Sequence, residues 1–248
     1  MGGEWIVPDW TVPAHVGTAV STRLGPGISE APFDRLNLGL RSGDEQATVL
    51  ANRAALVETL ELPAAPLWLR QVHGTTVAEG EPGGVEPEAD GAVAHGPGKV
   101  LAILTADCLP VLFVSADGQS IGAAHAGWRG LAAGVLERTV ERMGEGEIQA
   151  WLGPAIGQPS FEVGEEVRAA FVDADARAAS AFVGNRPGHW LCDIYALARL
   201  RLAAVGVTQV SGGGFDTRTD ERLYSYRRDG AKSGRFASLI WTKPPSFL

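Results

Sequence analysis

Three nearly continuous apolar segments lie close together in the middle of the chain, and they constrain its fold more than any other feature. They are Val100–Leu104, Pro110–Val114 and Ser120–Ala124, with a turn signal at Asp117-Gly118 between the last two. Strands with continuous apolar sequence are typical of sheets that are covered on both faces. We therefore expect a fold of the α/β (α+β) class, in which residues 1–248 form a single domain, a layered sandwich of mixed β-sheets flanked by helices.

The spacing of apolar residues and the positions of glycine predict the other elements. Asp44 is the expected N-cap of the first helix. The helix expected over Leu191–Val205 is apolar nearly all round, so we expect it to be buried between layers. Segments rich in Gly, Pro and Glu are expected to be solvated loops. The expected helices are Gln46–Leu60, Gly130–Met143, Gly164–Phe171 and Leu191–Val205, the further strands are Thr208–Ser211 and Ser238–Trp241, and the loops are Gly80–Gly98 and Gly184–Gly188.

Charge and cysteine content exclude several classes of function. A formal net charge of −8 argues against a nucleic-acid partner, which would favour a basic face. Two cysteines in 248 residues do not make a disulfide framework, and no segment approaches the roughly 20 apolar residues of a membrane span. The first residues lack the basic start and apolar run of a signal peptide. We expect a cytoplasmic protein that acts on small molecules, without a nucleic-acid or membrane partner; the sequence does not indicate its oligomeric state.

The residue types that bind metals are concentrated in three short segments. Of the five histidines and two cysteines, His73, Cys108 and His125 lie in segments that also carry Gly, Asp or Pro. A strand, a tight turn and a second strand join Cys108 to His125, so both should lie at neighbouring strand ends, whereas the spacing does not place His73. Each residue alone would more often belong to the core. Together they predict a catalytic metal site, because three protein ligands leave a fourth position for water.

The same residues admit a second interpretation, a thiol hydrolase. Cys108 would be the nucleophile, His125 or His73 its base, and Asp107 an orienting carboxylate. In an extended chain the side chains of Asp107 and Cys108 point to opposite faces, which weakens this arrangement. Chelation separates the two interpretations, because only a metal enzyme would lose its activity.

Several arginines lie where an anion could bind. Arg53 falls within the apolar face of the helix expected over 46–60, so it needs either a buried carboxylate or a bound anion, and a structural partner is favoured. Arg129 lies at the start of an expected helix, a position that attracts anions, but it could equally be a surface residue beside a glycine turn. The stretch Tyr224–Gly230, with Arg235 beyond it, is the most basic of the chain and is expected to be a solvated loop.

Longer motifs across nearly the whole chain resemble one family. The three that carry the candidate ligands are Arg70–Gly74, Thr105–Phe113 and His125–Gly130. Through them the chain is similar to the YfiH-type family, also called the peptidoglycan editing factor or polyphenol oxidase (laccase-domain) family. The resemblance also covers Leu36–Gly39, Gly43-Asp44, Asn52-Arg53, Leu152–Gly157, Phe161–Gly164 and Ser225–Asp229, whereas family members often carry Cys-Thr where this chain has Asp216-Thr217.

This resemblance implies a zinc site formed by His73, Cys108 and His125, whose ligand types also suit copper. It implies a purine nucleoside phosphorylase-like enzyme that cleaves adenosine, inosine and methylthioadenosine and also deaminates adenosine by hydrolysis. In deamination, zinc would activate water, and a carboxylate would have to move the proton. The candidates for that carboxylate are Asp107, Asp90 and Glu162, and those for binding substrate are Arg53, Arg129 and Arg228 for phosphate and Asn37 for sugar or base.

The names of the family leave two alternatives that would use the same Cys/His site. One is hydrolysis of a peptidoglycan precursor at a wrongly built muramyl amino-acid bond. The other is copper-dependent oxidation of polyphenols, but a multicopper cluster needs more histidine ligands than the five histidines of this chain. A protein that only binds its ligand would instead be indicated by a metal with no open position.

Overall fold

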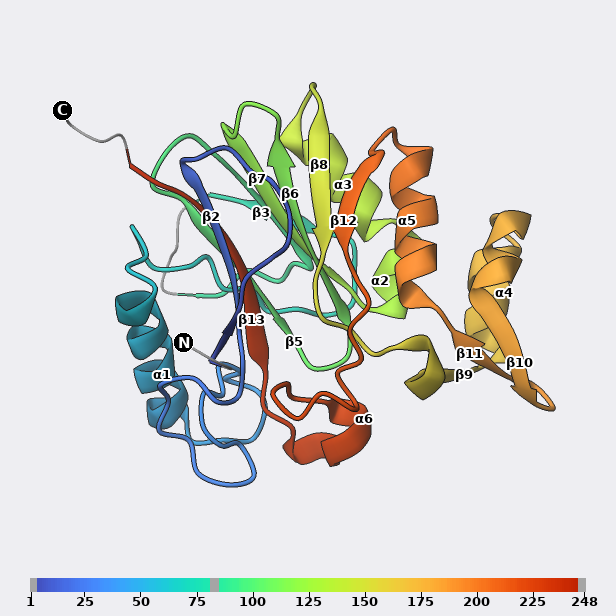
Figure 1. Ribbon diagram of the computed structural model, residues 1–248, viewed down its shortest axis with the longest axis horizontal. Coiled ribbons are helices and arrows are strands. Elements are labelled where there is room, and N and C mark those ends of the chain that lie inside the picture. The colour runs from blue at the N-terminus through green and yellow to red at the C-terminus, as the bar shows by residue number, and fades with distance from the viewer. Residues whose placement is uncertain (1–3, 81–84, 245–248) are drawn as a thin grey trace.

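Two β-sheets pack face to face, with helices on both outer sides. The computed structural model describes residues 4–80 and 85–244. The layers follow in order as one helix, a four-stranded sheet, a six-stranded sheet and a second group of helices (Figure 1). Each interface between layers has its own cluster of buried apolar side chains. The predicted layered sandwich of mixed sheets and helices is confirmed.

The four-stranded sheet is antiparallel throughout. Helix α1 (Gln46–Thr59) covers its outer face, where Leu56 belongs to one buried cluster with Val100 and Leu239. In spatial order the strands are β1 (Trp5–Ile6), β2 (Val16–Ser21), β13 (Phe236–Thr242) and β5 (Val100–Thr105).

The six-stranded sheet is mixed, since its two outermost pairs are parallel and the central pairs antiparallel. Helices α2 (Trp128–Ala133), α3 (Val135–Met143) and α5 (Ile194–Ala204) lie on the face that points away from the other sheet (Figure 1). In spatial order the strands are β12 (Gln209–Gly212), β8 (Ile148–Leu152), β6 (Leu109–Ser115), β7 (Ser120–Ala126), β4 (Gly91–His95) and β3 (Val77–Glu79).

A small three-stranded sheet lies beside the sandwich, next to helix α4 (Glu165–Val172) (Figure 1). Its strands, in the order β10 (Phe182–Arg186), β11 (His189–Cys192) and β9 (Glu162–Gly164), are antiparallel. The short helix α6 (Tyr226–Asp229) lies at the end of the sandwich where the candidate ligands are found. The remaining short helices are η1 (Gln158–Ser160), η2 (Ala176–Ala181) and η3 (Gly230–Lys232).

The continuous apolar sequence of β6 follows from its position in the middle of the sandwich. Side chains alternate between the two faces of a strand. Val111 and Phe113 therefore belong to the cluster under the helices, whereas Leu112 and Val114 belong to the cluster between the sheets. Both faces are buried, so the strand needs no polar positions, as the sequence predicted.

Several predicted boundaries were wrong. Gly134, with a φ of +100°, splits the expected helix 130–143 into α2 and α3, because only glycine adopts this left-handed conformation at little cost. Asp44 does not cap α1, which follows Glu45; its carboxylate instead accepts hydrogen bonds from Ser29 and Asn37.

Two further predictions failed because periodicity alone does not reveal neighbouring elements. The expected loop 80–98 contains the buried strand β4, whose small residues pack under α3, while residues 81–84 lie outside the described ranges. The expected helix 191–205 begins only at Ile194, after Asp193 caps it. That helix, α5, buries one face instead of lying buried between layers.

The candidate ligands lie where the chain crosses from one sheet to the other. Strand β5 belongs to the four-stranded sheet and β6 to the six-stranded sheet, so the crossing falls at 106–108. Asp107 lies in this crossing segment with a φ of +92°, a conformation that is rare for residues other than glycine. The register of β6 and β7 pairs Pro110 with His125. Cys108 and His125 therefore lie at neighbouring strand ends, as predicted.

Within residues 4–80 and 85–244, every helix is too short or too polar to cross a lipid bilayer.

The central position of β6 predicts the effect of a truncation there. Leu112 is fully buried between the sheets, so Leu112→Ala should lower the free energy of unfolding by about 2–5 kcal/mol. Leu50→Ala on α1 is the matched control, because Leu50 is 49% exposed and should change stability by less than about 0.5 kcal/mol. Urea unfolding followed by tryptophan fluorescence measures both, and equal effects would contradict the assignment of layers.

Candidate metal centre and its cavity

Three side chains from separate segments converge at the end of the sandwich. The ligand atoms of His73, Cys108 and His125 all lie within 4.8 Å of one another, a spacing at which they could hold one metal ion. The Sγ of Cys108 is 3.7 Å from Nε2 of His73, and the two imidazole rings are 4.7 Å apart between centroids. His125 is buried, Cys108 is half-buried and His73 is exposed. The spacing of the sequence could not place His73, and the fold brings it to the other two.

A buried carboxylate fixes both histidines. Asp90, at the start of β4, is fully buried and accepts a hydrogen bond from Nδ1 of His125 at 2.8 Å. It also accepts the backbone N–H groups of Val72, His73 and Gly74, at 3.1, 2.9 and 2.6 Å. These bonds hold the turn in which His73 has a φ of +63°. Because Nδ1 of His125 is engaged by Asp90, its Nε2 is the nitrogen left to bind a metal.

The glycines of the His125–Gly130 segment make room for this arrangement. A Cβ on Gly127 would lie 2.7 Å from Cδ2 of His73 and 3.2 Å from Sγ of Cys108, so any side chain there would enter the ligand cluster. A Cβ on Gly130 would lie 2.9 Å from the carbonyl oxygen of Gly74. These residues are thus explained by close packing between α2 and the His73 turn.

The electrostatics of the cluster favour a thiolate. Burial opposes ionisation of Cys108, but the charge and hydrogen bond of His125, with those of His73, outweigh it and lower the pKa of the thiol to about 6. Burial also disfavours a charged His125, yet the Cys108 thiolate and the bond to Asp90 raise its pKa to about 9. The thiolate is the form of cysteine that binds metals. Two imidazoles and one thiolate fit the donor set of zinc and also suit copper.

Asp107 tethers the crossing to the C-terminal part of the chain. Its Oδ1 accepts a hydrogen bond from Oγ1 of Thr217 and its Oδ2 one from the backbone N–H of Arg227, both at 2.6 Å. Its carbonyl oxygen accepts one from the N–H of Ile156. Asp107 is therefore held to three other residues and does not contact the ring nitrogens of the histidines in any hydrogen bond among the described residues.

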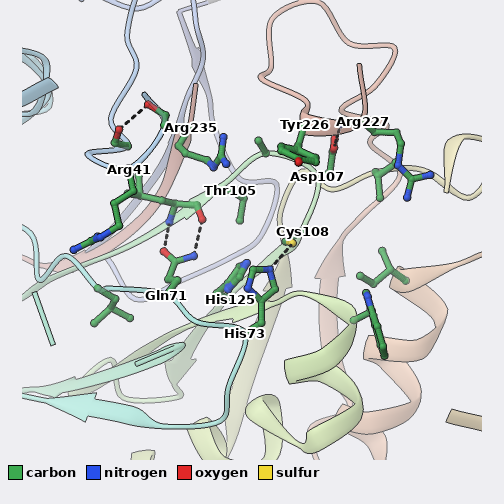
Figure 2. Close-up of a pocket in the computed structure, with 18 of the residues that line it drawn as sticks. Arg41, Gln71, His73, Thr105, Asp107, Cys108, His125, Tyr226, Arg227 and Arg235 are labelled. Carbon is green, nitrogen blue, oxygen red and sulfur yellow. Dashed lines mark hydrogen bonds between the residues drawn. The ribbon is translucent and has the colours of Figure 1, made fainter. Parts of the chain in front are cut away.

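The cluster lies in the wall of a cavity of about 420 Å³. Figure 2 shows His73, His125 and Cys108 close together, with Arg235, Tyr226 and Arg227 across the cavity from the histidines. Much of the remaining wall is apolar or aromatic, which is usual for sites that bind small molecules. The apolar and aromatic residues that line it are Leu40, Leu69, Leu104, Ile156, Ile194, Trp128, Phe161 and Tyr226.

The four residues expected to bind substrate lie outside the cavity wall. Asn37 is fully buried and bonds Ser42 and Asp44. Arg53 is buried as predicted and has a structural partner, because its Nη1 bonds Glu86 at 2.8 Å and its guanidinium lies 4.1 Å from the centre of the Trp68 ring. The assignment of these residues to substrate stays a prediction.

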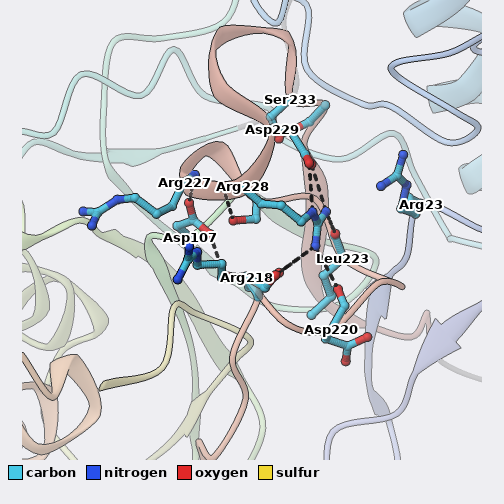
Figure 3. Close-up of polar contacts among 12 residues, drawn as sticks. Arg23, Asp107, Arg218, Asp220, Leu223, Arg227, Arg228, Asp229 and Ser233 are labelled. Carbon is cyan, nitrogen blue, oxygen red and sulfur yellow. Dashed lines mark hydrogen bonds and ion pairs between the residues drawn. The ribbon is translucent and has the colours of Figure 1, made fainter. Parts of the chain in front are cut away.

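The other two arginines also have partners. Arg129 is exposed and its guanidinium lies 4.4 Å from the centre of the Trp128 ring. Arg228 pairs with Asp229 and donates to backbone carbonyls of the loop 217–223 (Figure 3). In Figure 3 its guanidinium points away from Asp107 and into that loop.

Sequence analysis missed the arginines that do line the cavity. They are Arg41, Arg227 and Arg235. The last two belong to the basic stretch that was expected to be a solvated loop. Its composition was a usable signal, since a basic stretch is unusual in a chain with a net charge of −8.

The candidates for proton transfer differ in their positions. Asp107 lines the cavity, whereas Asp90 and Glu162 do not. Glu162 pairs with Arg186 and accepts a hydrogen bond from Asn185, and these contacts hold its pKa near 2.

Comparisons with known proteins cover nearly the whole chain. The model of a family described as multi-copper polyphenol oxidoreductase laccase matches residues 17–243. The purine nucleoside phosphorylase PA4543 of Pseudomonas aeruginosa is 55% identical over 241 residues, which cover 96% of this chain and 98% of the relative. The purine nucleoside phosphorylase YfiH of Escherichia coli is 51% identical, over 95% and 98%. The crystal structure of Neisseria meningitidis protein NMB0706 superposes with a TM-score of 0.92 at 44% identity, over 97% of this chain and 100% of that one.

The role of Asp90 can be tested by removing its charge alone. Asp90→Asn keeps the size of the side chain but replaces one acceptor oxygen by an amide donor, so it should lower the affinity of the candidate site for added Zn²⁺, used as the probe, about 10- to 100-fold. A competition titration against a chromophoric chelator measures this. Asp117→Asn, in the turn at the far end of β6 and β7, is the control and should leave the affinity unchanged. An unaltered affinity in Asp90→Asn would show that Asp90 does not orient the ligands.

Gly127 offers a test of the packing around the ligands. Gly127→Ala places a methyl group against His73 and Cys108, so metal content after purification should fall well below that of the wild type. Gly184→Ala is the matched control, because the nearest atom to its new Cβ, in the Trp190 ring, is 3.8 Å away. Elemental analysis of both variants decides the point, and full metal content in Gly127→Ala would refute the steric argument.

Proposed function

This chain belongs to the family described as multi-copper polyphenol oxidoreductase laccases, and from the chemistry of its cavity we propose that it cleaves purine nucleosides by phosphorolysis, with zinc at the His73, Cys108 and His125 site. The observation that carries the proposal is the joint presence, in one cavity, of a metal-ligand cluster, aromatic walls and arginines. The names of the relatives from P. aeruginosa and E. coli support the same reaction.

The cavity walls suit the parts of a nucleoside. Phe161, Tyr226 and Trp128 offer aromatic surfaces on which a purine can stack, as aromatic pairs do elsewhere in proteins. Arg41, Arg227 and Arg235 supply positive charge for phosphate, and a guanidinium can bind two of its oxygens at once. The cavity has a volume of about 420 Å³, within the range of roughly 300–1,000 Å³ common for small-molecule sites.

Asp90 orients the proposed metal ligands, and Asp107 fixes the wall of the cavity opposite them. His125 is oriented by Asp90, and His73 is held by the same carboxylate, so both ligands are fixed before substrate arrives. Asp107 holds the backbone of Arg227 and so fixes the opposite wall relative to Cys108. A bound zinc would supply a Lewis acid that stabilises negative charge on a nearby oxygen. An apolar wall beside the bound sugar would exclude water from its anomeric carbon, which would favour phosphorolysis over hydrolysis.

The metal is proposed to be zinc on the chemistry of the ligands. One thiolate and two imidazoles with one open position match catalytic zinc. Copper also accepts these ligands, and the family name includes it. Five histidines do not supply a multicopper cluster, so four-electron oxygen reduction does not fit this chain.

We extend the proposal to hydrolytic deamination of adenosine, for which the cavity wall offers the carboxylate of Asp107. Asp107 is the candidate for proton transfer that lines the cavity, but both of its oxygens already accept hydrogen bonds. A thiol hydrolase is the weaker interpretation of the same residues, because Asp107 does not orient either histidine. Hydrolysis of a peptidoglycan precursor stays an alternative, which turnover of a muramyl-serine substrate tests.

We also propose a cytoplasmic location, which is supported by the free thiols of Cys108 and Cys192. The net charge of −8 supports small-molecule substrates over nucleic acid.

Removal of one ligand tests the proposed reaction. The purified wild type should contain zinc and convert adenosine plus phosphate to adenine and ribose 1-phosphate, identified by chromatography. Cys108→Ala should lose zinc and at least about 100-fold in kcat/KM, and chelation of the wild type should have the same effect, reversed by zinc. Cys192→Ala is the matched control, since Cys192 is buried in β11 away from the cavity wall, and it should retain both.

The same assay distinguishes the alternatives. Zinc and phosphorolysis retained in full by Cys108→Ala would overturn the scheme. Turnover of a muramyl-serine substrate or of a phenol in oxygen, without turnover of adenosine, would replace the proposed function by one of the other two.

A further inference from the structure

The three arginines in the cavity wall differ in their partners. Arg41 pairs with Glu86 at 2.6 Å, and Arg227 bonds the carbonyl oxygen of Glu162 and lies over the Phe161 ring. Arg235 forms no ion pair with any residue in the described ranges, and its side-chain hydrogen bonds run from Nη1 to the backbone carbonyls of Ser233 and Gly234. Its Nε and Nη2 are left to donate elsewhere. A half-buried guanidinium without a directly paired carboxylate can take an anionic ligand as its partner.

The fold holds Arg235 in place through its backbone and its aliphatic stem. Its backbone N–H donates to Oδ1 of Asn37 at 2.9 Å, and its carbonyl accepts from the N–H of Leu38 at 3.0 Å. A Cβ on Gly39 would lie 2.7 Å from Cγ of Arg235, so the stem occupies the space that glycine leaves open. Asn37, which was expected to bind substrate, therefore fixes the backbone of Arg235.

The sheet register brings Arg235 to the ligand cluster. Phe236 pairs with Thr105 in the antiparallel register of β13 and β5. Arg235, the residue before Phe236, therefore lies beside residues 106–108, the segment that contains Cys108. The charges of Cys108 and Asp107 act on the guanidinium, whose pKa is lowered by burial and partly restored by them. In Figure 2 Arg235 lies on the same side of the cavity as Tyr226, with Thr105 between it and the histidines.

A second polar group in the same wall lacks a partner. The side chain of Thr105 is 98% buried, and its hydroxyl has no hydrogen-bond partner among the described residues, although the residue lines the cavity. An unsatisfied buried hydroxyl costs free energy, so native structures usually give it a partner. A rotation of the Thr105 side chain toward the cavity would let a bound ligand satisfy the hydroxyl, whose oxygen is buried in this structure.

We propose that Arg235 and Thr105 form an oxyanion subsite that binds the inorganic phosphate consumed by the enzyme, beside the metal ligands. The fork of the guanidinium binds two phosphate oxygens, and the hydroxyl of Thr105 donates to a third. This inference rests on the proposed phosphorolysis, and it assigns the phosphate to Arg235 in place of Arg53, Arg129 and Arg228, which have partners elsewhere.

The reaction at this subsite is balanced without a further reactant. An oxygen of hydrogen phosphate forms a bond to the anomeric carbon of the ribose, and the bond from that carbon to the purine nitrogen breaks. The electron pair of the broken bond leaves with the purine, which takes the proton that the phosphate loses. The products are ribose 1-phosphate and the free purine.

Steady-state kinetics with phosphate and adenosine as separately varied substrates test the subsite. Arg235→Gln in the zinc-loaded enzyme should raise KM for phosphate about 10- to 100-fold and leave KM for adenosine and zinc content near those of the wild type. Arg235→Lys should recover part of the loss, since it keeps the charge but not the fork. Arg177→Gln, which removes an exposed arginine paired with Asp175, is the control and should change nothing.

Thr105→Val provides a second variant that should fold at least as well as the wild type. It keeps the shape of the side chain and removes a hydroxyl that has no partner within the protein. Its thermal stability should therefore equal or exceed that of the wild type, while KM for phosphate rises several-fold. Unchanged phosphate KM in both Thr105→Val and Arg235→Gln would overturn the proposal.

Binding of phosphate can be measured without catalysis. Inorganic phosphate should raise the unfolding temperature of the wild type in a concentration-dependent manner, and Arg235→Gln should lose most of that shift. If the wild type shows this shift but no phosphorolysis, the proposed function fails and the subsite stands. If the wild type cleaves adenosine with phosphate but Arg235→Gln retains both the shift and the KM, the subsite fails and the proposed function stands.

Discussion

The buried carboxylate of Asp90 is the group on which the rest of the site depends. A charge in the core is tolerated only when it is fully hydrogen-bonded, and Asp90 meets that condition with the ring of His125 and three consecutive backbone N–H groups around His73. One group thereby joins β4, β7 and the turn after Arg70. It fixes which nitrogen of His125 faces the cavity, and it holds His73 in a left-handed conformation that would otherwise be unfavourable.

The position of the site follows from the crossing between the two sheets. The sheets share a buried cluster of apolar side chains, and the connection between β5 and β6 is one of the places where the chain passes from one sheet to the other. At that crossing Cys108 leaves the regular ladder and can face the histidines. Gly127 and Gly39 act in the same way at different places, because each leaves a space that a neighbouring functional side chain fills.

The distribution of arginines separates structural charge from charge available to a ligand. Arg53 and Arg228 are neutralised by carboxylates and carbonyls inside the protein, so their unusual positions are explained without substrate. Arg235 lies in the cavity wall with the candidate ligands, and among the described residues it has only backbone carbonyls as side-chain partners and no carboxylate. This difference, together with the small number of histidines, favours a reaction that consumes phosphate over oxidation by a copper cluster.

The sequence alone indicated the layered fold and the three residues of the candidate ligand cluster. Apolar runs specify strands covered on both faces, and the rarity of histidine and cysteine draws attention to three segments. The tertiary structure alone decided the position of His73, the hydrogen bonds of Asp90 and which arginines line the cavity. The reason is physical: periodicity and spacing report local geometry, whereas a partner for a buried charge comes from segments far apart in the chain. Asp90 and His125 become neighbours when β4 pairs with β7, and Glu86 and Arg53 become neighbours when the segment before β4 packs against α1.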